Sequence, residues 1–277
     1  MAGQKAIYLM LAALLLKGCG IADEERADES SVSVITQHTT VTTAATMPET
    51  EPLTEYLYPD AIAEMPAESL LQPEQIDPAV TTDYFSAMPL SDEIFARMNG
   101  VSFHENPNIT RDSLRYLRVL HYDPAGEIRT GEMICNQLIA SDLLAIFQKL
   151  YEAQYPIGRM VLVDDYAADD GASMAVNNTS CFNYRVIAGS TTLSVHAKGL
   201  AVDINPQFNP YVTFNAEGTA NIEPENGRAY ANRENFFPMK IDHDDLCYQL
   251  FTEHGFTWGG DWNSPKDYQH FEWNADT

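Results

Sequence analysis

The sequence predicts an α+β fold in which helices flank a small, largely antiparallel sheet. Two runs rich in β-branched and aromatic residues, 114–122 and 127–134, are separated by a Pro/Gly turn, which is typical of a hairpin. Residues 141–154 carry apolar side chains at helical spacing, so we expect this helix to pack on the sheet. These elements fall within residues 82–277, about 200 residues, which suffice for one domain with its own core.

The first 19 residues resemble an export signal. Lys5 precedes an apolar run, 6–16, that is too short to span a bilayer but has the length of a signal-peptide core. The run ends at Leu16-Lys-Gly-Cys19, which resembles the cleavage box of bacterial lipoproteins, although Lys17 departs from the small or apolar residue usual there. We therefore expect an exported protein, anchored through a lipid on Cys19 at the outer face of the bacterial cytoplasmic membrane or cell wall. An ordinary cleaved signal peptide is the alternative.

Residues 20–81 have the composition of an acidic tether rich in Thr, Ser and Pro. Between Asp23 and Glu74 there are twelve acidic residues against one basic residue. Low aromatic content and like charges predict disorder, and a simple solubilising spacer would have the same composition. The formal net charge of −24 argues against a nucleic-acid-binding protein, since such proteins neutralise phosphate with basic surface.

The first part of the domain contains three further predicted features. Residues 82–108 are expected to pack on the core as an extension that includes a helix, 91–98, capped by Ser91. Residues 159–163 predict a short strand. The acidic segment 164–170 lacks the ligand spacing of a calcium-binding EF-hand, so a solvated loop is expected.

The last part of the domain begins with a long segment, 205–235, that lacks periodicity. We expect an irregular loop at the rim of the functional site. Residues 242–254 predict a helix with acidic residues in its first turn and Gly255 as its stop signal. Trp258 and Trp262 follow and could line a cleft or fill the core.

Three residues, His196, Asp203 and His270, have the chemistry of metal ligands. Neutral imidazole and carboxylate suit Zn2+, which in catalytic sites takes three protein ligands and leaves a position open. The gap between His196 and Asp203 does not fit a helical pair, so the two are expected on a loop and the strand after it. Gly199 and Ala201 would be small where the backbone passes close to the metal or a neighbouring strand.

Asp267, three residues before His270, is a further carboxylate with no ligand role in this scheme. A carboxylate beside a metal can take a proton from a water molecule and hand it to a leaving amine. This is the chemistry of a peptidase.

Both motifs resemble those of the zinc D-alanyl-D-alanine carboxypeptidases, a family that includes vancomycin-resistance carboxypeptidases and L-alanyl-D-glutamate peptidases. The matching patterns are Ser-x-His-x-x-Gly-x-Ala-x-Asp at 194–203 and, after Trp-Gly-Gly-Asp-Trp, Asp-x-x-His-Phe at 267–271. The resemblance implies a hedgehog-like α+β fold, the zinc ligands His196, Asp203 and His270, and a metal-bound water activated by Asp267.

Three more residues are site candidates. Segment 173–185 is similar to one branch of the family, and its Arg185 would hold a substrate carbonyl or carboxylate and stabilise negative charge, unless it is a surface or salt-bridging arginine. Ser194 would either bind substrate and orient a ligand, or be a turn residue. Trp262 would wall the substrate cleft.

Three functions follow from this reasoning. The first is a D-alanyl-D-alanine carboxypeptidase, acting as a monomer on the stem peptides of peptidoglycan. The second is an L-alanyl-D-glutamate endopeptidase, for which an aspartate in the place of the base is more typical. The third is a non-catalytic zinc-containing module that binds the cell wall, against which a complete ligand set with a base argues.

Overall fold

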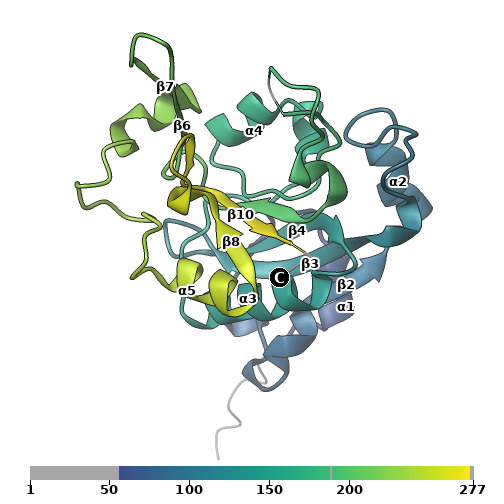
Figure 1. The fold of residues 1–277 in the computed structure, drawn as a ribbon. Coiled ribbons are helices and arrows are strands. Elements are labelled where there is room, and N and C mark those ends of the chain that lie inside the picture. Colours follow the sequence, from purple (N-terminus) through teal and green to yellow (C-terminus); the bar gives the residue numbers. More distant parts are fainter. Residues whose placement is uncertain (1–55, 188, 275–277) are drawn as a thin grey trace, which may run out of the picture. The chain divides into compact units, whose positions relative to one another are not determined.

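The computed structural model of the chain describes residues 56–187 and 189–274, which belong to one compact unit spanning 51–277 (Figure 1). The predicted signal peptide, Cys19 and the tether up to residue 55 lie outside the described residues. The described part is a mixed α+β structure with small antiparallel sheets, as the sequence predicted. None of its helices is long and apolar enough to cross a membrane.

The largest sheet has four antiparallel strands in the order β1-β4-β3-β2. Its centre is the predicted hairpin, in which Leu114 pairs with Asn136 at one end and Tyr122 with Ile128 at the other. The strands are β1 (Leu70–Leu71), β2 (Ser86–Pro89), β3 (Leu114–Tyr122) and β4 (Ile128–Asn136).

The helix α3 (Ala140–Glu152) packs against β3 and β2 and confirms the helix predicted from apolar spacing. Its buried residues Leu143, Phe147 and Leu150 join the main core. Helix α5 (Leu246–Glu253) contacts α3 and β8 (Phe256–Trp258), and Figure 1 shows α5 and α3 side by side near β8. It begins later than predicted, because residue 245 is its cap: the Asp245 side chain accepts a hydrogen bond from the Cys247 backbone.

Two three-stranded sheets carry the C-terminal half, in the orders β5-β10-β8 and β7-β6-β9. The first contains β5 (Ala201–Asp203) and β10 (His270–Trp273) beside β8. The second contains β6 (Tyr211–Phe214), β7 (Ala220–Glu223) and β9 (Lys266–Asp267). Residues 205–235 therefore do not form the irregular loop that we predicted, since they contain the β6–β7 hairpin and a 3-10 helix, η6 (Glu225–Tyr230).

Residues 56–81 differ from the expected tether, because they fold onto the domain. They contain α1 (Pro59–Ala63), β1, η1 (Pro73–Gln75) and the start of η2 (Pro78–Tyr84). Ile62, Leu71 and Ile76 are buried in the main core. The folded domain thus begins before residue 82.

Residues 92–98 form α2 (Asp92–Met98), whose first turn is capped by the Ser91 side chain, as predicted. The predicted strand 159–163 is wrong: Arg159 forms only an isolated bridge, to Asn178. The acidic segment 164–170 is not a solvated loop either, because it lies in η4 (Val163–Tyr166) and at the start of α4 (Asp170–Ala175). The remaining short elements are η3 (Arg111–Ser113), η5 (Val195–Lys198) and η7 (Gly259–Asp261).

Candidate active site

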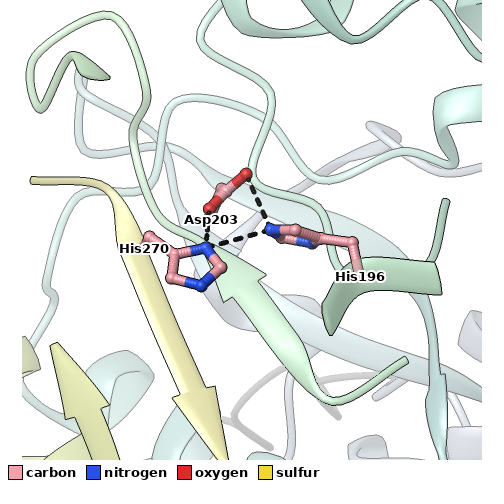
Figure 2. Close-up of side chains that lie close together, drawn as sticks. All are labelled: His196, Asp203 and His270. Atoms are coloured by element: carbon pink, nitrogen blue, oxygen red, sulfur yellow. Dashed lines mark hydrogen bonds and ion pairs between the residues drawn. The ribbon is translucent and has the colours of Figure 1, made fainter. Parts of the chain in front are cut away.

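His196, Asp203 and His270 converge at the junction of η5, β5 and β10, as Figure 2 shows. Asp203 and His270 face each other directly across the antiparallel β5–β10 pair. One atom of each of the three residues lies within 4.8 Å of the other two, and all three residues are buried. The sequence therefore identified three groups that the fold does bring together.

The orientation of His196 is fixed by the chain around it. Its Nδ1 contacts the backbone oxygen of Cys181 at 2.6 Å. Because a carbonyl oxygen only accepts hydrogen bonds, Nδ1 carries a hydrogen, and Nε2 is the ring nitrogen that faces the other two residues and could bind a metal. The Ser194 side chain accepts a hydrogen bond from the His196 backbone at 3.3 Å and caps the turn that carries this histidine.

The ring of His270 is also fixed by a contact, made through the nitrogen that faces away from His196 and Asp203. Its Nε2 lies 3.3 Å from Oε2 of Glu272, while its Nδ1 faces Asp203 Oδ1 at 3.1 Å and His196 Nε2 at 3.1 Å. A carboxylate on the outer nitrogen of a metal-binding histidine fixes its ring and raises its basicity.

These distances fit a zinc ion. His196 Nε2 and His270 Nδ1 are 3.1 Å apart, and each lies close to a different oxygen of Asp203: Nε2 is 3.2 Å from Oδ2 and Nδ1 is 3.1 Å from Oδ1. Ligand atoms placed about 2.0–2.1 Å from a tetrahedral zinc would be about 3.3 Å apart. Two imidazole nitrogens and one carboxylate oxygen are also the donor set that zinc accepts.

The electrostatics of the three residues favour a cation at their centre. Burial disfavours the charged form of Asp203, but the electrostatic interaction with His196 and the hydrogen bonds to both imidazoles outweigh burial and hold the pKa of Asp203 far below its usual range. Burial likewise lowers the pKa of His270, yet hydrogen bonds to Asp203 and Glu272 raise it to about 10. A bound metal would supply the positive charge that protons supply without it.

Asp267 lines the same pocket from a different sheet. It lies on β9, which pairs with β6, and Tyr211 is its partner across that pair. Its Oδ1 is buried and has no hydrogen-bond partner among the described residues. Burial raises the pKa of Asp267 above its ordinary value. A buried carboxylate with an unused oxygen beside a metal site suits a proton acceptor.

Two glycines allow the chain to approach the site closely. A Cβ on Gly259 would lie 2.7 Å from the backbone oxygen of Asp267 and 3.3 Å from Cβ of His270. Gly199, with φ +65°, would meet the Asn136 backbone nitrogen of β4 at 2.7 Å. The small residue predicted at Gly199 is thus needed against a neighbouring strand.

Arg185 lies in the pocket but is already paired. Its Nη2 donates to Oδ2 of Asp170 at 2.6 Å, and its Nε has no partner among the described residues. Sequence reasoning assigned Asp170 to a solvated loop and missed this contact. The acidic composition of 164–170 was the only sequence signal at Asp170. It does not indicate that this segment packs against Arg185.

The two tryptophans have different places. Trp262 is half-buried, lines the pocket and packs its ring 5.3 Å from that of His270. Trp258 is buried in the core and donates from Nε1 to the backbone oxygen of Tyr268. Trp262 therefore lines the pocket, and Trp258 belongs to the core.

The pocket has a volume of about 180 Å³, and the residues in it that the sequence did not suggest include Tyr211, Glu223 and Gln269. Gln269 is 2% exposed, its Oε1 lacks a partner among the described residues, and its side chain favours the ionised form of Asp267. It follows Asp267 by two residues, but its sequence position alone gave no reason to select it.

Residues 188–273 match the family model described as D-alanyl-D-alanine carboxypeptidase. Curated proteins and solved structures yield no significant match. The matched segment contains all three candidate ligands and Asp267, and the match supports the family resemblance predicted from the two motifs. Asp170 and Arg185 lie outside it.

Proposed function

We propose that this chain, a relative of the D-alanyl-D-alanine carboxypeptidases through residues 188–273, is a zinc-dependent peptidase that hydrolyses peptidoglycan stem peptides and removes their terminal D-alanine. The observation that carries the proposal is the meeting in one pocket of three candidate metal-binding atoms and a carboxylate, Asp267, whose Oδ1 is buried and has no partner among the described residues. A purely structural zinc site would close its coordination with protein and would need no such carboxylate.

His196, Asp203 and His270 would hold the zinc ion. Bound there, zinc would polarise the scissile carbonyl and lower the pKa of a water molecule. Asp267 accepts a proton from the attacking water and returns it to the leaving amine, so that the C–N bond breaks with no net change in protonation of the carboxylate. Trp262 bounds the cleft next to His270 and excludes water from one side.

Arg185 supplies hydrogen bonds to the substrate oxygen on which negative charge develops. Its pairing with Asp170 favours a second candidate function, because the carboxylate of Asp170 offsets the charge of the guanidinium and so weakens its preference for a substrate carboxylate over a carbonyl. An L-alanyl-D-glutamate endopeptidase meets a carbonyl at this place, whereas a carboxypeptidase meets the free terminal carboxylate. The substitution Asp170→Asn leaves the Arg185 side chain with its positive charge uncompensated. The effect of this change on hydrolysis distinguishes the two candidate functions.

The test uses the purified protein, zinc-loaded or treated with a chelator, and pentapeptide stems with either a free or an amidated C-terminus. Chelator-sensitive loss of one alanine from the free-acid peptide alone supports the carboxypeptidase. Cleavage of both peptides between L-alanine and D-glutamate supports the second candidate. With no chelator-sensitive cleavage of either peptide, the peptidase assignment is wrong and a non-catalytic module that binds the cell wall is left.

We also propose that the protein acts outside the cytoplasmic membrane, held there through Cys19. The support is the apolar run 6–16 followed by the lipoprotein-like cleavage box. Metabolic labelling with a radioactive fatty acid tests it, since label should enter the natural chain and be absent from a Cys19→Ala variant.

A further inference from the structure

The cleft continues past the metal site into a second groove. This groove has a volume of about 870 Å³ and lies between α4 and the segment formed by β7 and the start of η6. Asp170, Met174, Arg185 and Glu223 line both the pocket and the groove, so the two form one continuous depression. Figure 1 shows α4 and β7, the two elements that contribute residues to the walls of this groove. Helix α4 also contacts η6.

Glu223 is placed relative to Asp267 by the small sheet β7-β6-β9. Tyr211 on β6 is the direct partner of Glu223 on one side and of Asp267 on the other. Directly opposed residues in antiparallel strands have their side chains on the same face, and neighbouring strands are about 4.8 Å apart. Glu223 and Asp267 thus belong to one row, with backbones about 10 Å apart by the same spacing.

The charge of Glu223 is not balanced by protein. Among the described residues no basic side chain lies within ion-pair distance, and the carboxylate accepts only a hydrogen bond from Nδ2 of Asn221, at 2.7 Å. The single arginine of the groove, Arg185, is neutralised by Asp170. The groove therefore offers an unbalanced negative charge at the end of the row.

Part of the wall of this groove is apolar. Met174, Val186 and Ile222 contribute aliphatic side chains to its walls. Aliphatic wall residues in the same groove as an exposed carboxylate without a basic partner are complementary to a side chain with a methylene stem and a terminal ammonium group. A shorter side chain on a residue next to the scissile bond would not cross the separation between Asp267 and Glu223.

We propose that this groove is a subsite for a substrate residue with a long aliphatic side chain ending in a free amine, the diamino acid of a stem peptide, and that Glu223 recognises the amine. The proposal rests on the proposed function and adds to it the class of residue that the enzyme selects. It holds for either of the two candidate bonds, since it concerns a neighbouring residue of the same peptide.

The test compares two stem peptides that differ only at this amine, which is free in one and acetylated in the other. We expect Glu223→Gln to raise KM for the free-amine peptide on the order of tenfold, the size of one lost charge-assisted hydrogen bond, with little change in kcat. Acetylation should raise KM of the natural protein by a similar factor. Acetylation of the peptide should cause no further rise in KM in Glu223→Gln, because the substitution and the acetylation remove the same contact.

Glu217→Gln is the matched control, because it removes the same charge from the turn of the same hairpin, between Asn215 and Thr219, outside both the pocket and the groove. An equal rise in KM for both peptides in Glu223→Gln, or the same rise in Glu217→Gln, would overturn the proposal. Calorimetric titration of both peptides into the zinc-loaded protein gives the same comparison without turnover. A preference for the free amine in binding, lost in Glu223→Gln, would support the subsite even in a protein that cleaves neither peptide.

Discussion

Gly259 offers the sharpest test of the geometry around Asp267 and His270. In Gly259→Ala the new Cβ would lie 2.7 Å from the Asp267 backbone oxygen and 2.8 Å from its Cβ. The first separation is about 0.7 Å short of ordinary van der Waals contact, which begins at 3.4 Å, and backbone atoms cannot swing aside as the end of a long side chain can. The strand that carries Asp267 must therefore shift by several tenths of an ångström.

Two effects should follow from this shift. The free energy of unfolding should fall by about 1–3 kcal/mol, as for other overpacked sites. The displacement of Asp267 should lower kcat by roughly 100-fold, because a misplacement near 1 Å at a reacting centre has an effect of that size. Urea unfolding measures the first effect and hydrolysis of a stem peptide by the zinc-loaded protein measures the second.

Gly126→Ala is the control for general destabilisation. Gly126 lies in the β3–β4 turn with φ +80° and no heavy atom within 4 Å of its added Cβ, so alanine there meets only backbone strain of about 1–2 kcal/mol. It should lose comparable stability and keep its kcat. If Gly259→Ala kept kcat within twofold of the natural protein while losing stability, Asp267 would not be the proton acceptor in the pocket that we describe.

Three further predictions concern the base, the metal and the core. Asp267→Asn should lower kcat by roughly 10²–10⁴-fold, the usual contribution of general base catalysis, and keep its zinc, so activity and metal analysis are measured on the same sample. His196→Ala leaves two ligands and should lose zinc on dialysis and with it all hydrolysis, and full zinc content by mass spectrometry would contradict the assigned ligand set. Burial opposes the charge of Glu132, but hydrogen bonds from Arg97 and Tyr116 outweigh burial and lower the pKa of Glu132. The ionised carboxylate therefore stabilises the folded protein above the pKa that Glu132 has in the unfolded chain, and this stabilisation is lost as the pH falls through the pKa in the folded protein. The free energy of unfolding of Glu132→Gln should therefore be about 1.5–3 kcal/mol lower than that of the natural protein at pH 7, and this difference should shrink below about pH 4. A difference in unfolding free energy that does not change with pH would show that lost packing is the cause.

The sequence predicted those parts that depend on local pattern. The β3–β4 hairpin and α3 were found because side-chain alternation and helical spacing extend over many residues. The three candidate metal ligands were found because their side chains suit zinc and their two motifs resemble those of a known family; one of these motifs contains Gly199, which is needed against β4.

The missed features depend on contacts between distant segments. Strands β6 and β7 are short, and their sheet is completed by β9, more than 40 residues after β7 in the sequence. Glu223 gained a place in the site only through this pairing. The acidic composition of 56–81 suggested disorder, yet three well-spaced apolar residues, Ile62, Leu71 and Ile76, were enough to fix the segment on the core.

The position of the ligands along the chain has a consequence for folding. His196 and His270 are 74 residues apart, and an ion held between them would close a loop that contains both small sheets except β10. By the polymer estimate used for disulfides, such a cross-link removes conformational entropy from the unfolded chain worth about 4 kcal/mol at 25 °C. Metal bound at this site would therefore act as a staple for the C-terminal half of the domain, and the same ion would both promote hydrolysis and keep the polypeptide folded.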